Sequence, residues 1–276
     1  VLKGEGSEFL QHLLVMGDSP QGARPKALVY RDPVNLEFST QDSDQHEAWL
    51  IKFPAQQEHP EVCAIEAVYA ECLRLCAIET PDTHFFNLPN GLTAFASKRF
   101  DRQNGMRIPM QSLAAYTGAD YKVPGSLDYR NFLRATLMCT QDVRERLHAF
   151  KRAVFNVLFN NRDDHTKNFS FLMEKNGQWK LAPAYDVTFC EGPGGYHQMD
   201  IMGEALNISR NDIHKLGTSE ANLTTLEVDE IILAMREIAL QFSQIAQRLY
   251  PHQIRESTLQ MIQSRIQQNI DFLTET

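Results

Sequence analysis

The stretch "NNRDDHTKNFSFLMEKNGQWKLAPAYDV" (160–187) decides the predicted fold, because a cluster of polar side chains stands directly before a β-hairpin. The apolar run "FKRAVFNVLF" (150–159) precedes it and has the composition of a core helix. "FSFLM" and "WKLAPAY" are predicted as two short strands, since Asn176-Gly177 between them is a strong signal for a tight turn. The polar cluster therefore lies between a buried helix and a hairpin.

The predicted hairpin brings three oxygen-bearing side chains to one end of the ribbon. About eight residues lead from Asn168 to the turn and about nine lead back to Asp186, so the two side chains return to the same end. Asp163 lies in the short loop that feeds the hairpin. We expect Asp163, Asn168 and Asp186 to converge.

The chemistry of these three groups points to phosphoryl transfer. Asp and Asn oxygens are ligands that Mg²⁺ takes, usually completed by water and substrate phosphates. A further Asp in the preceding loop can accept the proton of an attacking hydroxyl, as in a kinase catalytic loop of the form D-x4-N. The pattern D-x4-N alone is weak, and each residue taken singly fits a solvated connector. The helix before it, the hairpin after it and the return of Asp186 make the combination specific.

The remaining sequence predicts a strand-rich front and a helical back. The overall class is α+β, and two lobes are expected, 1–102 and 103–276, with the join near 97–110. The predicted elements are strands at 26–30 and 48–54, a hairpin over 84–101, and helices at 59–79, 128–139, 142–160, 225–249 and 252–273.

Composition narrows the functional class. The chain has 276 residues, of which 43% are hydrophobic and 22% charged, as in ordinary globular proteins. No apolar run approaches the roughly 18 residues of a membrane span, so no membrane partner is expected. The net charge of −8 argues against a broad nucleic-acid-binding surface.

The five cysteines form no CxxC pair and favour a reducing cytoplasm as the location. Because the chain does not begin with Met, a missing N-terminal piece is possible.

The front of the chain contains candidate phosphate-binding residues. "GDSPQGARPKALVY" (17–30) places Gly17 and Gly22 in a loop before a strand, where backbone N–H groups can cradle phosphate. Ala23-Arg24 follow Gly22, which excludes a Walker-type loop. Lys52 stands in the apolar strand "LIKFP", and the next helix carries Glu66, so the two can pair as the strand Lys and helix Glu of kinases do.

Taken together, these segments resemble the HipA family. "GDSPQGARPKAL", "LIKFP", "SKRFDR", "NNRDDHTKNFSF" and "LAPAYDV" occur in the order and spacing of these serine/threonine-kinase toxins of bacterial toxin–antitoxin modules. The resemblance covers nearly the whole chain, from about Gly17 to the last helix, and implies a two-lobed, protein-kinase-like fold with a strand-rich N-lobe and a mainly helical C-lobe.

The resemblance also implies a role for each matching residue. Asp163 would be the catalytic base, Asn168 and Asp186 would hold Mg²⁺, and Lys52 would contact the phosphates of ATP. Ser19 matches the serine of the family's Gly-rich loop that is autophosphorylated, where a phosphate would occupy the place of ATP's own phosphates. The residues implied in or near the ATP site are Lys52, Gly22, Lys98, Phe100, Asp101, His165 and Lys167, with Lys98–Asp101 as the hinge. His165 also reads as a residue that orients the loop.

The implied partners and the departures follow from the same comparison. The substrate would be a translation component such as an aminoacyl-tRNA synthetase, and the partner a helix-turn-helix antitoxin of the HipB type, with DNA reached only through that antitoxin. The family usually has an additional N-terminal subdomain, of which at most a remnant lies before Gly17. Asp186 is followed by Val187-Thr188 rather than Phe-Gly, so no switching through a Phe flip is expected.

Two alternatives remain open at the level of sequence. A small-molecule kinase could share the same D-x4-N machinery, with a substrate pocket built by the C-terminal helices. A nucleotide-binding regulatory module, without catalysis, is the alternative from another class.

Overall fold

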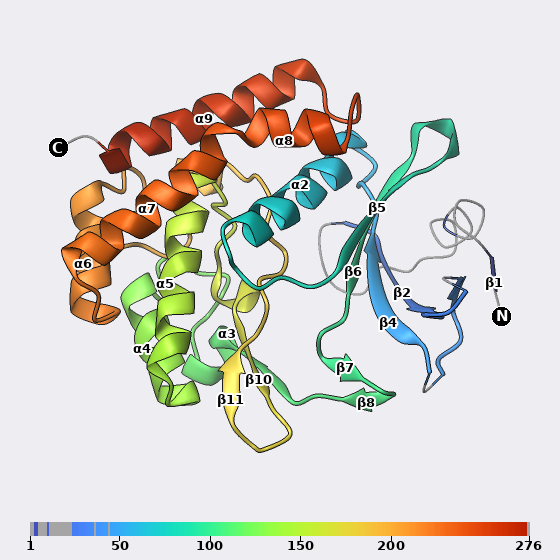
Figure 1. Cartoon of the computed structure of the whole chain (residues 1–276), viewed down its shortest axis with the longest axis horizontal. Helices are drawn as coiled ribbons and strands as arrows, with labels where there is room; N and C mark the ends of the chain where they lie inside the picture. The colour runs from blue at the N-terminus through green and yellow to red at the C-terminus, as the bar shows by residue number, and fades with distance from the viewer. Residues whose placement is uncertain (1–2, 5–9, 11–23, 36, 44, 275–276) are drawn as a thin grey trace.

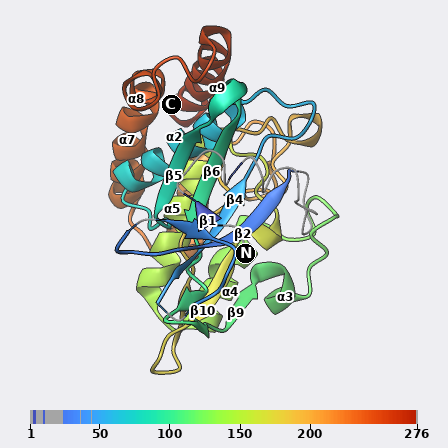
Figure 2. The same ribbon diagram turned by 90° about the vertical axis from the view of Figure 1, so that its right-hand side faces the viewer.

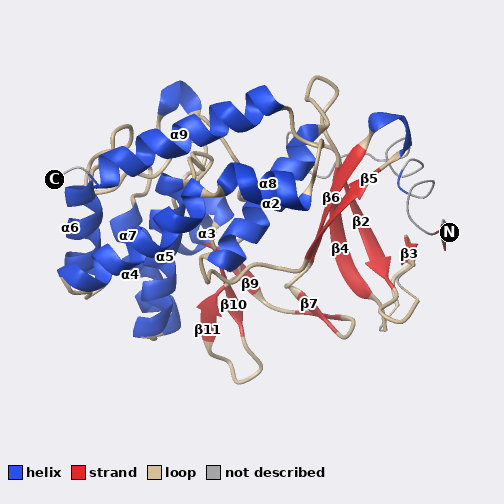
Figure 3. Cartoon of the chain, turned by 45° about the horizontal axis from the view of Figure 1, so that its top comes forward, coloured by secondary structure: helices blue, strands red, loops and turns tan. Residues whose placement is uncertain are grey.

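The large sheet and the helices occupy opposite sides of the molecule (Figures 1 and 3). The computed structural model describes residues 3–4, 10, 24–35, 37–43 and 45–274. Seen from the side of the sheet, the strands face the viewer and the helical part lies behind them (Figure 2). This is the predicted pair of lobes, one rich in strands and one mainly helical.

The N-lobe is built on a six-stranded antiparallel sheet of order β1-β3-β2-β4-β6-β5. Its strands are β1 (Lys3–Gly4), β2 (Lys26–Arg31), β3 (Phe38–Ser39), β4 (Glu47–Lys52), β5 (Thr83–Asn87) and β6 (Thr93–Lys98). Trp49 and Ile51 alternate along β4 and enter an apolar cluster with Val29 of β2, as expected of a sheet with one buried face. The predicted hairpin over 84–101 is confirmed, with a 3₁₀ turn at Pro89–Gly91.

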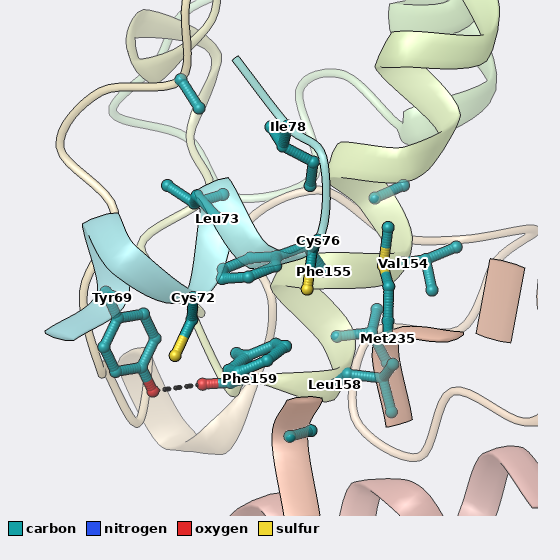
Figure 4. Packing of buried hydrophobic residues seen from close by; sticks show 14 of the residues in the cluster. Tyr69, Cys72, Leu73, Cys76, Ile78, Val154, Phe155, Leu158, Phe159 and Met235 are labelled. Carbon is teal, nitrogen blue, oxygen red and sulfur yellow. Dashed lines mark hydrogen bonds between the residues drawn. The ribbon is translucent and has the colours of Figure 1, made fainter. Parts of the chain in front are cut away.

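Helix α2 (Glu61–Leu75) packs between the sheet and the helical lobe (Figure 1). One side of α2 contacts Phe95 of β6, and the other side enters the core of the C-lobe. There the Tyr69 hydroxyl donates to the carbonyl oxygen of Phe159 at 2.5 Å (Figure 4). The helix is shorter than the predicted 59–79, because the chain turns at Ala77, whose φ is 52°.

The C-lobe consists of helices around one continuous apolar core, part of which Figure 4 shows. Its helices are α3 (Leu113–Thr117), α4 (Tyr129–Thr140), α5 (Val143–Leu158), α6 (Arg210–Glu220), α7 (Thr225–Leu240), α8 (Phe242–Leu249) and α9 (Glu256–Thr274). Asp128 and Asp142 cap α4 and α5 by accepting backbone N–H groups of the first turn, which fixes where each helix begins.

One prediction about the back of the chain was wrong, and one helix was missed. The segment 225–249 is two helices rather than one, because Gln241 ends α7 and begins α8 with φ −95° and ψ 5°. Helix α6 was not predicted, although Ser209 and Asp212 form a capping box in which each side chain accepts a backbone N–H of the other residue.

The predicted hairpin after the polar cluster is confirmed and carries a third strand. β10 (Ser170–Met173) pairs with β11 (Trp179–Leu181), and β9 (Met110–Ser112) lies on the other side of β10. Gly177 in the turn has φ 82°, a conformation that glycine adopts without strain. The short hairpin β7 (Arg102–Gln103) and β8 (Met106–Arg107) lies where the join of the lobes was expected. The division at 102 and 103 itself stays a prediction.

Two further properties concern the chain as a whole. All five cysteines are free thiols, and three of them are buried in the core. Among the described residues, no helix combines the length and the apolar character needed to cross a bilayer.

Candidate active site

Lys52 joins the two lobes through a pair of carboxylates. It ends β4, is only 6% exposed, and pairs with Glu66 of α2 and with Asp186 Oδ1, the latter at 2.5 Å. Burial disfavours the charged ammonium, but the two carboxylates outweigh burial and raise the pKa of Lys52 above its ordinary value. The predicted pairing of Lys52 with Glu66 is thus present, and Asp186 adds a link from the C-lobe.

Arg24 extends this charge network toward the loop before β2. Its Nε donates to Glu58 Oε2 at 2.8 Å, and its Nη1 lies 3.5 Å from Glu66 Oε2. Gly17, Ser19 and Gly22, the predicted residues of the phosphate loop, lie outside the described residues. The described part of the chain resumes at Arg24, which is joined to Glu58 before α2 and to Glu66 within α2.

Asp186 lies beside the catalytic loop because the hairpin β10–β11 returns the chain there. The Tyr185 hydroxyl contacts Ser170 Oγ and the Lys167 carbonyl oxygen, each at 2.6 Å, which fixes the strand return to the 3₁₀ turn Thr166–Asn168. Asp186 itself has φ 56°, in the left-handed region that few non-glycine residues adopt. Burial opposes its ionisation, yet the ion pair with Lys52 outweighs burial and lowers the pKa of Asp186 to about 2.

Asp163 lies in the loop that the sequence singled out. Its side chain is 46% exposed, and its Oδ1 accepts a hydrogen bond from Gln198 Nε2 at 2.8 Å. His165 Nε2 is 3.8 Å from the same oxygen. Burial raises the pKa of Asp163 above its ordinary value, while His165 acts in the opposite direction. Of the two carboxylates in the loop, Asp163 is therefore the one open to a reacting group.

Asp164 has the opposite environment and is fully buried. Its Oδ2 contacts the Tyr129 hydroxyl at 2.8 Å and His197 Nδ1 at 2.7 Å, and its Oδ1 accepts the backbone N–H of Gln198 at 2.7 Å. Asp164 is therefore not a solvated loop residue. Asp164 instead anchors the loop around His197 to the catalytic loop.

Asn168 completes the local geometry of the loop. Its Nδ2 donates to the backbone carbonyl of Asp163 at 2.8 Å, so the amide nitrogen is used within the loop. The side-chain oxygen accepts no hydrogen bond from the described residues. An oxygen on Asn168 and an ionised carboxylate on Asp186 fit the hard, oxygen-preferring Mg²⁺.

The two groups cannot form a complete protein cage. The described residues contain no cluster of three or more His, Cys, Asp or Glu side chains able to hold a metal ion. Mg²⁺ usually completes its ligand set with substrate phosphates and water. The same ion would have to displace Lys52 from Asp186 Oδ1, or bind at the other carboxylate oxygen.

A cavity of about 490 Å³ opens between the lobes next to these residues. Lys52, Glu66 and Asp186 line it at one end, and the predicted hinge residues Lys98, Phe100 and Asp101 line it as well. The ring of Phe100 lies 5.4 Å from that of Tyr185, so the hinge also contacts the segment that carries Asp186. The predicted phosphate-contacting and hinge residues thus share one cavity.

Within the hinge, several polar groups already have partners in the protein. The backbone N–H groups of Lys98 and Arg99 donate to Asp82 and Ala48. Lys98 Nζ pairs with Glu47 at 2.5 Å. Arg99 and Arg102 both hold the Asp101 carboxylate; burial opposes its ionisation, but the arginines outweigh burial and lower its pKa.

Lys167 lies apart from the cavity lining. Its Nζ is 3.5 Å from the centre of the Tyr121 ring, in a cation–π contact, and the rings of Tyr121 and His165 are 5.9 Å apart. A role of Lys167 and His165 toward nucleotide stays a prediction. Gln198 and His197 were not recognised as part of the site, because their contacts cross more than thirty residues of sequence.

A strand-rich lobe with a Lys–Glu pair, facing a helical lobe that carries Asp163, Asn168 and Asp186, is the arrangement of a protein-kinase-like fold. Residues 19–248 match the family described as HipA-like C-terminal domain, and the chain belongs to this family.

Two solved structures share the fold. The HipA chain of the Shewanella oneidensis MR-1 complex of HipA, HipB and operator DNA superposes with a TM-score of 0.73 at 16% identity, covering 93% of this chain and 64% of that one. The Helicobacter pylori proinflammatory kinase CtkA gives a TM-score of 0.54 at 15% identity, covering 82% and 87%. At these identities the likeness shows the fold alone.

A curated relative from Haemophilus influenzae is named "Putative kinase". It is 25% identical over 193 residues, which are 62% of this chain and 52% of the relative. The chain therefore spans about half the length of this relative.

Proposed function

We propose that this chain is an ATP- and Mg²⁺-dependent kinase that phosphorylates serine or threonine hydroxyls of protein substrates. The observation that carries the proposal is the contact of Lys52 with both Glu66 and Asp186 at one end of the cavity between the lobes. In kinases this lysine grips the phosphates of ATP and this aspartate faces the metal. The family match supports the same class.

In the proposed reaction the acceptor oxygen forms a bond to the γ-phosphorus, and the bond from that phosphorus to the β–γ bridging oxygen breaks. The proton of the acceptor hydroxyl passes to Asp163, and ADP leaves with the bridging oxygen. Lys52 holds the phosphates in place, and the hinge from Lys98 to Asp101 holds the base and ribose. Mg²⁺ on Asn168 and Asp186 would neutralise the charge of the phosphates.

The exposure of Asp163 favours a protein acceptor over a small molecule. Nearly half of its side chain is accessible, and it lies outside the lining of the cavity assigned to the nucleotide. A hydroxyl on the surface of a large partner can approach such a group. By family resemblance we propose a translation component such as an aminoacyl-tRNA synthetase as the target, with autophosphorylation at Ser19 as self-silencing.

The first experiment is intact-mass spectrometry of the purified protein after incubation with Mg²⁺ and ATP, with Asp163→Asn in parallel. A gain of phosphate in the wild type alone, mapped to Ser19, is the expected result. Without a gain, an ATP-dependent thermal shift separates two cases, because a ligand at about 100 times its Kd adds roughly 2.7 kcal/mol of stability. A shift indicates a regulatory binder or a kinase that requires its own substrate. If the protein shows neither a gain of phosphate nor a thermal shift, the proposal is rejected.

The partner that we propose is a helix-turn-helix protein of the HipB type, through which the chain reaches DNA. The solved Shewanella oneidensis complex of HipA, HipB and operator DNA supports this, and the net charge of −8 fits indirect rather than direct DNA contact. Gel filtration of this chain with a purified HipB-type helix-turn-helix protein tests it. Binding of operator DNA by this chain alone would contradict it.

The five free thiols fit the reducing cytoplasm that we propose as the location of this chain.

A further inference from the structure

The backbone of Gln198 is fixed on both sides. Its N–H donates to Asp164 Oδ1 at 2.7 Å, and its carbonyl accepts the N–H of Gly125 at 2.8 Å. His197 and Met199 on either side are buried, at 4% and 1% exposed. A residue held in this way presents its side chain in one direction, since the backbone cannot rotate without breaking buried bonds.

The Gln198 side chain is directed at Asp163. Its Nε2 lies 2.8 Å from Asp163 Oδ1. The nitrogen rather than the oxygen of the amide must face this carboxylate, because two oxygen acceptors without a proton repel each other. Gln198 therefore uses one oxygen of Asp163 and leaves Oδ2 for other contacts.

We propose that Gln198 is a positioning residue that holds the Asp163 carboxylate in its reactive orientation, and that buried Asp164 holds Gln198 in turn. The proposal rests on the proposed function, in which Asp163 accepts the proton of the substrate hydroxyl. The two adjacent carboxylates then have different roles. Asp163 contacts the substrate, and Asp164 fixes Gln198, which orients Asp163.

The need for such a residue follows from the exposure of Asp163. A half-exposed Asp side chain can occupy several staggered rotamers, which point its Oδ2 in different directions. Misplacing a catalytic group by about 1 Å can cost on the order of 100-fold in rate. His165 is 3.8 Å away and too distant to hold the carboxylate by a hydrogen bond.

The test compares two variants of nearly the same size as the native side chain. Gln198→Met removes the donor, and Gln198→Glu replaces it with a charge that repels Asp163, while both keep the backbone N–H to Asp164. Gln260→Met, on the exposed face of α9, is the matched control. Steady-state rates are measured at pH 7.5 with ATP and an acceptor peptide in turn as the varied substrate.

We expect kcat to fall roughly 10- to 100-fold in Gln198→Met and further in Gln198→Glu, with KM for ATP within twofold of the wild type. The control should keep both constants. A loss of packing alone would affect the two variants equally and would lower the stability. Full kcat in Gln198→Met would overturn the proposal, as would a loss expressed only in KM for ATP.

A second measurement does not depend on activity. The side-chain amide of Gln198 is assigned in NMR spectra by its absence from Gln198→Met, and its proton exchange is compared in wild type and Asp163→Ala. We expect a protected, shifted amide proton that loses both properties without Asp163. An amide that does not respond to Asp163→Ala would refute the positioning role. If the wild type transfers no phosphate to any acceptor, the proposed function fails, but this measurement still decides the contact.

Discussion

At the scale of single residues, the lysine between two carboxylates dominates the energetics of the site. An ammonium that is 6% exposed survives in the charged form only because Glu66 and Asp186 both approach it. Glu66 lies within α2, whereas Asp186 comes from the segment that follows β11 in the C-lobe.

The first prediction concerns this buried pair. Lys52→Met leaves the Glu66 carboxylate buried and should lower the free energy of unfolding by about 3 kcal/mol, the low end for broken buried pairs. The low end applies because Arg24 still lies 3.5 Å from Glu66. Adding Glu66→Leu should restore most of the stability but none of the phosphoryl transfer. Urea unfolding and the kinase assay are the measurements.

The exposed Lys175→Met, in the hairpin turn, serves as the control and should change neither property. If the double variant is no more stable than Lys52→Met, then the cost does not come from an unpaired charge. In that case the loss of packing around the lysine stem is the better explanation.

The same scale shows where sequence reasoning reaches its limit. Asp163 and Asp164 are identical neighbours in sequence, yet one is half-exposed and the other fully buried with three hydrogen-bond donors. Nothing in a run of polar letters reports burial, because burial depends on the loop around His197 that packs there from later in the chain. The polar loop before the hairpin could therefore be predicted, but not which of its two carboxylates is buried.

At the scale of elements, the segment that follows Asp186 is built onto the catalytic loop. Cys190 bridges to Asn161 in parallel, and the Arg162 guanidinium donates to the Gly195 carbonyl. The turn at 192–195 is rich in glycine and places His197 and Gln198 under the loop. Direct contacts with the loop 160–168 therefore hold this segment in place.

The second prediction compares two glycines with positive φ. Gly177 and Gly192 have φ of 82° and 70°, and a left-handed backbone costs an alanine about 1–2 kcal/mol. The ψ of 161° at Gly192 adds to this cost, because that combination of angles is essentially limited to glycine. A methyl group at 177 meets open space, whereas at 192 it would overlap the Tyr196 carbonyl and lie 2.8 Å from Arg162 Cβ. Gly192→Ala should therefore cost roughly 1–3 kcal/mol more than Gly177→Ala.

Only the substitution at 192 should also lower kcat, because its loop carries the residue that holds Asp163. Thermal unfolding and steady-state kinetics on the pair test both statements. Equal losses of stability would mean that the loop relaxes freely around the added methyl group, and the support of Asp163 by this loop would then be weaker than argued.

The elements that the sequence predicted are those with strong local signals. The hairpin β10–β11 follows from two short apolar strands and the Asn-Gly turn, and α5 follows from the spacing of its apolar residues. The break between α7 and α8 has no such signal, since Gln241 is neither Gly nor Pro and the bend comes from packing. Helix α6 is polar, and only its capping box marks it.

At the scale of the whole molecule, α2 is tied to the C-lobe along its length. Arg255 and Thr258, which flank the start of α9, both donate to Glu61 in the first turn of α2. The Tyr69 hydroxyl reaches Phe159 from the middle of α2, and after its end the Glu79 carbonyl accepts the N–H of Ala184 at 2.7 Å. These contacts fix the position of Glu66 relative to Asp186. The helix is thus fixed to the C-lobe at its start, at its middle and after its end.

The last prediction tests this connection through pH. Burial disfavours the ionised Glu61 carboxylate, but the hydrogen bonds from Arg255 outweigh burial and lower its pKa. A lowered folded-state pKa means that the contact stabilises the fold above the ordinary pKa of Glu, and that this stability is lost as the pH falls through the folded value. Glu61→Gln should therefore lower the free energy of unfolding at pH 7, by about 1–2 kcal/mol because Arg255 stays half-exposed to solvent.

At pH 3 to 4 the difference between wild type and Glu61→Gln should shrink, which urea unfolding across this range measures. Glu237→Gln, whose partner Arg236 is on the surface, is the control and should show little difference at any pH. Hydrogen exchange of α2 at pH 7 tests whether Glu61 also holds α2 in place. If Glu61→Gln leaves exchange in α2 unchanged while lowering stability, then Glu61 stabilises the C-terminal helices without fixing α2. If exchange rises along α2 and kcat falls together, the C-terminal helices set the position of Glu66 in the active site.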